Sequence, residues 1–205
     1  MTTPVPATKR RRSREQTRQR LLEAALTVFA HNGFERATVD EIVREAGFSK
    51  GAFYVHFETK DDLFWELLEE RVGKQQEMFR AALDPSLGVE ENERRILNAV
   101  FDMRRTDPLS PAIFLEFTAH AMRNEKVRLQ IAELYARWHS FVVDMLTEGR
   151  AAGMVRKDVE VGVLASVLQA VIEGTLLQAN LAPPELRLNK HVDELAKLLA
   201  EWVAP

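Results

Sequence analysis

Residues 34–64 read FERATVDEIVREAGFSKGAFYVHFETKDDLF. Apolar residues recur at the spacing of a helix within this stretch, at Val39, Ile42, Val43 and Ala46. Thr38 precedes them, and Glu41 follows Thr38 by three residues, which is the pattern of a capping box at a helix N-terminus. The stretch therefore predicts a short helix that begins directly after Thr38.

A tight turn follows this helix at Ala46-Gly47-Phe48. Glycine enters the left-handed backbone region without a steric penalty, so Gly47 can reverse the chain there. Ser49 is the expected N-cap of a second, very short helix that ends near Val55. Two short helices joined in this way form a helix-turn-helix, whose second helix can enter the major groove of DNA.

Helical spacing continues on both sides of the motif. Before it, an apolar stripe leads to Gly33 as the expected C-cap and comprises Leu22, Ala25, Leu26 and Phe29. After it, a fourth helix is expected from Thr59, and later helices are expected to break at Pro85–Gly88, Thr106–Pro111, Arg123–Asn124, Gly153–Lys157 and Pro183–Pro184. No segment alternates as a strand does, which predicts an all-α fold of about nine helices.

The expected domain organisation follows the order of the chain. Residues 1–13 contain two prolines and a basic run, and are expected to form a disordered basic arm. Residues 14–60 are expected to form a three-helix, helix-turn-helix DNA-binding domain. Residues 61–205 are expected to form a larger helical domain for ligand binding and dimerisation.

The net charge of −3 conceals an uneven distribution. Residues 1–60 contain eleven Lys and Arg against seven Asp and Glu, so they carry +4 and the remainder carries −7. This favours a polyanion as partner of the N-terminal part, the alternative being a solvated basic tail. The absence of cysteine excludes disulfides and thiolate chemistry, and neither a signal peptide nor a long apolar run is evident, so we expect a cytoplasmic protein with no membrane partner.

The helix-turn-helix segment resembles the signature of the TetR family of transcriptional regulators. The residues that lie on this pattern are Thr38, Ile42, Ala46, Gly47, Ser49, Gly51, Tyr54, His56, Phe57, Lys60 and Leu63. The likeness is close over residues 34–64 and looser over the first helix. Phe48 and Phe53 stand where the family often has valine and leucine, and both remain apolar.

The resemblance implies a set of DNA-binding residues: Thr38, Arg44, Ser49, Lys50, Gly51, Ala52, Tyr54, His56 and Lys60. The first residues of the second helix, Lys50 to Ala52, would face base edges. Tyr54 and His56 would contact phosphates and so fix the register of the protein on the duplex. Thr38 and Lys60 begin helices, where backbone N–H groups favour a phosphate.

Each of these assignments has a structural alternative. Tyr54 can be a core residue and His56 an idle surface histidine, whereas Thr38 and Ser49 cap helices whether or not they touch DNA. Phe53 and the Phe57 ring are expected in the core, because helical spacing points them inward.

Residues 114–178 resemble the regulatory half of the choline-responsive, BetI-like branch of this family. Its members dimerise through their last two long helices, which implies a homodimer and a pseudo-palindromic double-stranded DNA operator. The apolar stripes expected at the dimer interface contain Leu164, Leu168, Val171, Ile172, Thr175, Leu195, Leu198, Leu199 and Trp202.

The resemblance also implies a small-molecule pocket between the central helices. Its candidate lining residues are Phe101, Phe114, Glu116, Phe117, His120, Trp138, Phe141, Gln169 and Glu173. Aromatic residues at helical spacing more often fill a core, but Glu116 and His120 lie four apart, as do Gln169 and Glu173. A buried carboxylate needs a partner, and we favour pairing within the protein over a cationic or amphipathic ligand.

These observations predict a sequence-specific DNA-binding regulator, a repressor that a small-molecule inducer releases from its operator. The alternatives are an all-α small-molecule-binding protein or enzyme without specific DNA binding, and an architectural protein that needs no ligand. The sequence contains no P-loop, GxGxxG, HExxH or nucleophile elbow, so no catalytic residue or cofactor is expected. Glu116, His120 and His139 form too sparse a set to predict a metal site.

Overall fold

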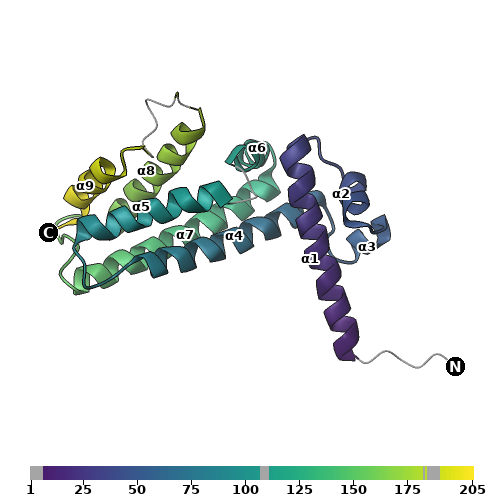
Figure 1. Cartoon of the computed structure of the whole chain (residues 1–205), viewed down its shortest axis with the longest axis horizontal. Coiled ribbons are helices and arrows are strands. Elements are labelled where there is room, and N and C mark those ends of the chain that lie inside the picture. Colours follow the sequence, from purple (N-terminus) through teal and green to yellow (C-terminus); the bar gives the residue numbers. More distant parts are fainter. Residues whose placement is uncertain (1–6, 107–110, 182, 184–189) are drawn as a thin grey trace. The chain divides into compact units, whose positions relative to one another are not determined.

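The computed structural model of the chain describes residues 7–106, 111–181, 183 and 190–205. Within these residues it contains nine α-helices, which confirms the expected all-α fold (Figure 1). In chain order the helices are α1 (Ala7–Asn32), α2 (Val39–Ala46), α3 (Lys50–Tyr54), α4 (Lys60–Ala82), α5 (Val89–Thr106), α6 (Pro111–Ala121), α7 (Glu125–Ala151), α8 (Val161–Leu181) and α9 (Val192–Val203).

Helix α1 begins earlier than expected. The sequence predicted a disordered arm over residues 1–13, but the helix already includes Ala7–Ser13, while residues 1–6 lie outside the described part. Alanine, lysine and arginine favour helices, and Pro6 is the last proline before them, so nothing local stops the helix from extending to Ala7.

The helix-turn-helix has the predicted caps. Thr38 Oγ1 accepts a hydrogen bond from the Glu41 N–H at 3.3 Å, and the Glu41 carboxylate accepts the Thr38 N–H at 2.9 Å, which completes the capping box. Ser49 Oγ accepts the Ala52 N–H at 3.3 Å at the start of α3. Gly47 lies between the two helices at φ 72°, the left-handed conformation that glycine adopts most readily.

The chain forms two compact units that are not contiguous in sequence. The head unit comprises residues 1–70 and 108–127, and the body unit comprises residues 71–107 and 128–205. Helix α6 therefore belongs to the same unit as α1–α3, and the boundary near residue 70 falls within α4. The sequence predicted a domain boundary after residue 60. The predicted domains were consecutive in the chain, so they could not assign α6 to the head unit.

Four phenylalanine rings form the centre of the head unit. Phe29 comes from α1, Phe34 from the loop that follows α1, Phe64 from α4 and Phe117 from α6, and all four are almost fully buried. The Phe34 ring lies 5.5 Å from Phe29 and 4.9 Å from both Phe64 and Phe117, between ring centroids. These tilted and edge-on arrangements are the favourable ones for aromatic rings, so the four elements are held together through Phe34.

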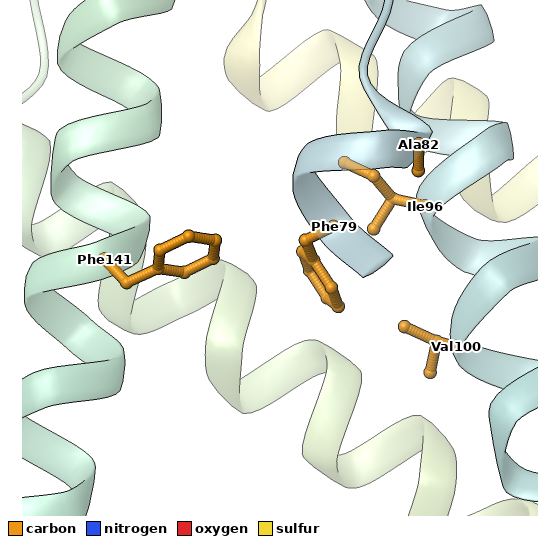
Figure 2. Close-up of a cluster of buried hydrophobic side chains, with 5 residues drawn as sticks. All are labelled: Phe79, Ala82, Ile96, Val100 and Phe141. Atoms are coloured by element: carbon orange, nitrogen blue, oxygen red, sulfur yellow. The ribbon is translucent and has the colours of Figure 1, made fainter. Parts of the chain in front are cut away.

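Three apolar clusters form the core of the body unit. The Phe79 cluster comprises Phe79, Ala82, Ile96, Val100 and Phe141. The Leu97 cluster comprises Leu97, Phe101, Leu195, Ala196 and Leu199. The Leu146 cluster comprises Leu146, Val155, Leu164, Ala165 and Val203. Figure 2 shows Phe141 of α7 pointing toward Phe79 of α4, with Val100 of α5 on the far side. Helix α5 contributes to the Phe79 and Leu97 clusters and packs along α9, so it is the central helix of this unit.

Truncation of Phe117 to alanine tests whether α6 is an integral part of the head unit. The change should lower the free energy of unfolding by about 3–5 kcal/mol, because it leaves a cavity among the aromatic rings. The matched variant Leu115→Ala, on the same helix but 39% exposed, should cost less than about 1 kcal/mol. Urea unfolding of both variants gives the comparison, and equal losses would contradict the packing described above.

Candidate nucleic-acid interface

Helix α3 presents the expected recognition residues to solvent. Lys50 and Gly51 are exposed in its first turn, and Ala52 is half-buried. Phe53, on the opposite face, is fully buried and lies 5.5 Å from the Phe57 ring, so the helix cannot rotate without exposing its anchor. The short helix is therefore fixed with its N-terminal turn free to approach a base edge.

The Lys50 ammonium is bound to a carboxylate of the preceding helix. Its Nζ lies 2.8 Å from the Asp40 Oδ1, and this hydrogen bond raises the pKa of Lys50 above its ordinary value. Both side chains are more than half exposed, so the pair contributes little to stability. The Lys50 ammonium is therefore already paired within the head unit, which the spacing of the sequence did not reveal.

Tyr54 and His56 differ in exposure. Tyr54 is 57% exposed, which excludes the alternative that it is a core residue. His56 is half-buried, and burial, with a smaller effect of Arg14, lowers the pKa of its imidazole. Burial therefore favours the neutral ring, which has one N–H donor.

The Lys60 side chain is engaged within the head unit. Its Nζ donates to the carbonyl oxygens of Phe34 (2.6 Å), Ala37 (3.0 Å) and Glu35 (3.3 Å). These bonds use all three donors of an ammonium, and burial lowers the pKa of Lys60. The ammonium therefore fixes the loop before α2, while the phosphate contact that the resemblance implies for the backbone N–H at the start of α4 stays a prediction.

The remaining expected contacts lie at the ends of α2 and α3. The Thr38 hydroxyl is engaged with the Glu41 carboxylate at 2.8 Å, and Ser49 caps α3, so both have their structural role in any case. Arg44 is exposed on the last turn of α2. Arg14 was not among the DNA contacts that the motif implied; its Nη2 donates to the Val55 carbonyl at 3.1 Å and so ties α1 to the end of α3.

The α6 candidates for the ligand pocket lie in the head unit. Phe117 is in the aromatic centre, and Phe114 is half-buried on the same helix. The Glu116 carboxylate accepts the Phe34 N–H at 2.6 Å, and His120 Nδ1 lies 3.2 Å from Glu35. Glu116 is thus paired within the protein, as the sequence favoured.

A glycine makes the Glu116 contact possible. Gly33 has φ 75°, and a Cβ built there would lie 2.7 Å from the Glu116 carboxylate. Gly33 therefore has two roles. It is the predicted C-cap of α1, and its lack of a side chain leaves room for the Glu116 carboxylate. Next to it is an open hollow of about 440 Å³, whose lining includes His31, Arg36 and Ile113.

The other pocket candidates lie in the body unit. Phe101 and Phe141 are buried in the Leu97 and Phe79 clusters, and Trp138 packs against the latter. Glu173, in contrast, is exposed and accepts hydrogen bonds from Gln169 (3.0 Å) and from the hydroxyl of Tyr135 (3.4 Å). Gln169 and Glu173 are therefore paired with each other, and the Glu173 carboxylate does not lie inside the core.

Four of the nine expected interface residues are buried in their own chain, and three more are half-buried. Leu164, Thr175, Leu195 and Leu199 are buried, and Leu168, Val171 and Ile172 pack partly against the Leu97 cluster. Only Leu198 and Trp202 of the expected set are exposed apolar residues. Helix α8 is apolar on nearly all sides, so its sequence pattern did not show which face is outward.

Comparisons with known proteins agree with this architecture. Residues 21–67 match the family model "Bacterial regulatory proteins, tetR family", and residues 89–203 match "BetI-type transcriptional repressor, C-terminal". The HTH-type transcriptional regulator AcrR of Shigella flexneri is 28% identical over 203 residues, which is 95% of this chain and 93% of that protein.

Two solved structures share the fold. GusR of Salmonella enterica superposes with a TM-score of 0.73 at 24% identity, over 91% of this chain and 96% of that one. The FadR regulator of Bacillus subtilis, solved in complex with stearoyl-CoA, superposes with a TM-score of 0.71 at 20% identity, over 90% and 98%.

The fold and the exposed recognition helix define a DNA-binding transcriptional regulator and not an enzyme. The chain belongs to the TetR family and carries a BetI-type C-terminal domain.

The pairing of Lys50 with Asp40 leads to a prediction about DNA affinity. Asp40→Asn should tighten DNA binding by up to about five-fold, because it frees the ammonium from an exposed ion pair worth at most about 1 kcal/mol. Titration of labelled DNA at fixed salt measures the effect. In the background of Lys50→Met the same Asp40→Asn change should have less than about half the effect, because its target is gone. An undiminished gain in that background would show that Asp40 acts only as a general negative charge.

Proposed function

We propose that the protein is a homodimeric, cytoplasmic repressor that binds a pseudo-palindromic DNA operator and leaves it when a small molecule binds the body unit. The observation that carries the DNA-binding part is helix α3. Its Lys50-Gly51-Ala52 turn and Tyr54 are accessible, while Phe53 holds the helix from behind. Lys50 is suited to a guanine edge or a phosphate, and the Ala52 methyl to a thymine methyl.

Phosphate contacts would orient this helix in the groove. Tyr54 and His56 each supply one donor near the end of α3, and Arg44 supplies a cation at the end of α2. Thr38 and Ser49 would bring the N-terminal backbone of their helices toward phosphates. The Lys60 ammonium is bound by carbonyl oxygens, so Lys60 would contact a phosphate through its backbone N–H at the start of α4.

The outward face of α8 supports dimerisation. Among the described residues, α8 is the helix that is long and apolar enough to span a membrane. Only 17% of its segment Val161–Ala179 is buried, so much of this apolar helix is uncovered within its own chain. Its accessible stripe follows spacings of four and three residues, through Val163, Val167, Ala170, Gly174, Leu177 and Leu181. Such a stripe suits a second copy of the same helix, and the small residues Ala170 and Gly174 would allow close approach.

The C-terminal helix extends this surface in the proposed dimer. Leu198 and Trp202 of α9 are exposed and lie four residues apart, hence on one face. A two-fold dimer would present two α3 helices about one DNA turn apart, roughly 34–36 Å. Ligand binding in the body unit would change this separation through α4, which continues from one unit into the other.

Selection of binding sites from genomic DNA with the purified protein, at about 150 mM salt, tests the proposed function. We expect one pseudo-palindromic site to be enriched. The double variant Lys50→Ala, Tyr54→Ala should bind it at least about 100-fold more weakly, because it loses a base contact and a phosphate contact. Lys74→Ala, which removes an exposed lysine of the body unit, is the control and should bind normally. Diffuse binding with no preferred site would refute the specific repressor.

Gly174 provides a direct test of the dimer. A Cβ at this position would meet nothing within 4 Å in its own chain, so Gly174→Arg should fold normally but keep two α8 helices apart. We expect a monomer of 23.4 kDa by sedimentation, with operator binding weakened by about 10-fold or more. Gly73→Arg, an equally open glycine on α4, is the matched control and should remain dimeric. A dimeric Gly174→Arg protein would place the interface elsewhere.

A further inference from the structure

His120 of α6 lies between the loop before α2 and the start of α4. Its Nδ1 lies 3.2 Å from the Glu35 Oε1 in that loop, and its Nε2 lies 3.5 Å from the Asp61 Oδ1 in the first turn of α4. All three residues belong to the head unit. The imidazole therefore faces a carboxylate at each of its two nitrogens.

The imidazole is held in this place by the aromatic centre of the head unit. Its side chain is only 24% exposed, and its ring lies 5.5 Å from the Phe34 ring and 6.1 Å from the Phe117 ring, between centroids. The Nε2 atom is buried and has no hydrogen-bond partner among the described residues, although Asp61 is close. One polar atom of this ring is thus enclosed beside a carboxylate without being bonded to it.

A neutral imidazole cannot satisfy both carboxylates. It has one N–H donor and one nitrogen lone pair, so a proton on Nδ1 serves Glu35 and leaves the Nε2 lone pair facing the negative Asp61 oxygen. An imidazolium has an N–H at both nitrogens and can donate to both carboxylates. Histidine is the side chain that ordinarily changes charge between about pH 5 and pH 8. A proton at Nε2 would therefore turn one contact of α6 into two.

The other charged groups around the ring have partners of their own. The Lys60 ammonium donates to three carbonyl oxygens of the loop before α2, and the Glu116 carboxylate accepts the Phe34 N–H. On α7, the Lys126 ammonium lies 3.7 Å from Asp62. The Lys60 charge opposes a positive ring and the Glu116 charge favours one, so their effects on the imidazole have opposite signs.

We propose that His120 is a positioning residue for DNA binding, and that it holds the loop before α2 fully only when both of its ring nitrogens are protonated. Glu35 lies three residues before Thr38, the N-cap of α2. Asp61 follows Lys60, whose ammonium binds the same loop. The protonated ring connects these two anchors from α6. This inference rests on the proposed function and gives that regulator a control by pH.

The control acts on the share of molecules that are ready to bind DNA. Loss of the proton from Nε2 releases the first turn of α4 from α6, so the loop before α2 has one restraint fewer. The apparent affinity of a protein for its partner falls with the fraction of molecules in the competent geometry. Operator binding should therefore be tighter at pH 6 than at pH 8.

Nitrogen-15 NMR of the full-length protein without DNA tests the protonation states of the ring. The His120 signals are assigned by their absence in His120→Gln. We expect the proton on Nδ1 at about pH 8 and a second proton on Nε2 at about pH 6. In Asp61→Asn the new amide can donate to the Nε2 lone pair, so the ring should stay neutral to a lower pH than in the wild type.

Titration of the DNA site enriched by operator selection, at about 150 mM salt and at pH 6 and pH 8, tests the effect on binding. Other groups near DNA also titrate, so the pH effect in the wild type is divided by that in His120→Gln. We expect this ratio to show at least about three-fold tighter binding at pH 6, as for a partly exposed ion pair. Asp61→Asn should lose most of the effect. His31→Gln, an exposed histidine of the head unit, is the matched control and should keep the wild-type profile.

Three results would overturn the proposal. They are a ring that carries its proton on Nε2 at pH 8, a ring that is still neutral at pH 6, and a pH profile of DNA binding that is the same in His120→Gln and the wild type. An equal loss of affinity at both pH values would belong to the third, because it would show a merely structural role. The NMR experiment needs no DNA, and operator selection at one pH does not test His120, so the proposed function and this proposal can fail separately.

Discussion

The Phe34 backbone is the point on which the geometry of the head unit depends. Its carbonyl oxygen accepts a hydrogen bond from the Lys60 ammonium of α4, and its N–H donates to the Glu116 carboxylate of α6. Its ring lies among the phenylalanines of α1, α4 and α6, with the Lys60 Nζ 4.3 Å from the ring centroid. The carbonyl group of Phe34 is thus held by α4, its N–H group by α6, and its ring by the phenylalanines of α1, α4 and α6. Because Thr38, the N-cap of α2, follows only four residues later, the position of the helix-turn-helix is set from this residue.

The interactions at the DNA-facing surface are of the opposite kind. The Lys50–Asp40 pair is exposed, so water and salt weaken it. Tyr54 is exposed, and its ring packs edge-on against Phe53. The head unit therefore combines a rigid support, built from buried rings and a saturated ammonium, with an exposed surface whose interactions are weak, as the proposed DNA contacts require.

The sequence predicted local features well, because their causes are local. The capping box at Thr38, the left-handed Gly47 and the Ser49 cap each depend on residues within a few positions of one another, and all three are confirmed. What it missed depends on contacts between distant segments. The burial of the Lys60 ammonium requires the loop at Phe34, 26 residues away, and the Glu116 hydrogen bond spans 82 residues.

Helix α6 shows that the boundary of the family model and the physical boundary of the head unit do not coincide. The BetI-type match runs over residues 89–203 and includes α6, whereas residues 108–127 belong to the compact head unit. A helix of the regulatory sequence thus supplies Phe117 to the aromatic centre and Glu116 to the Phe34 N–H. A displacement of α6 would act on the loop that leads into α2 without passing along α4.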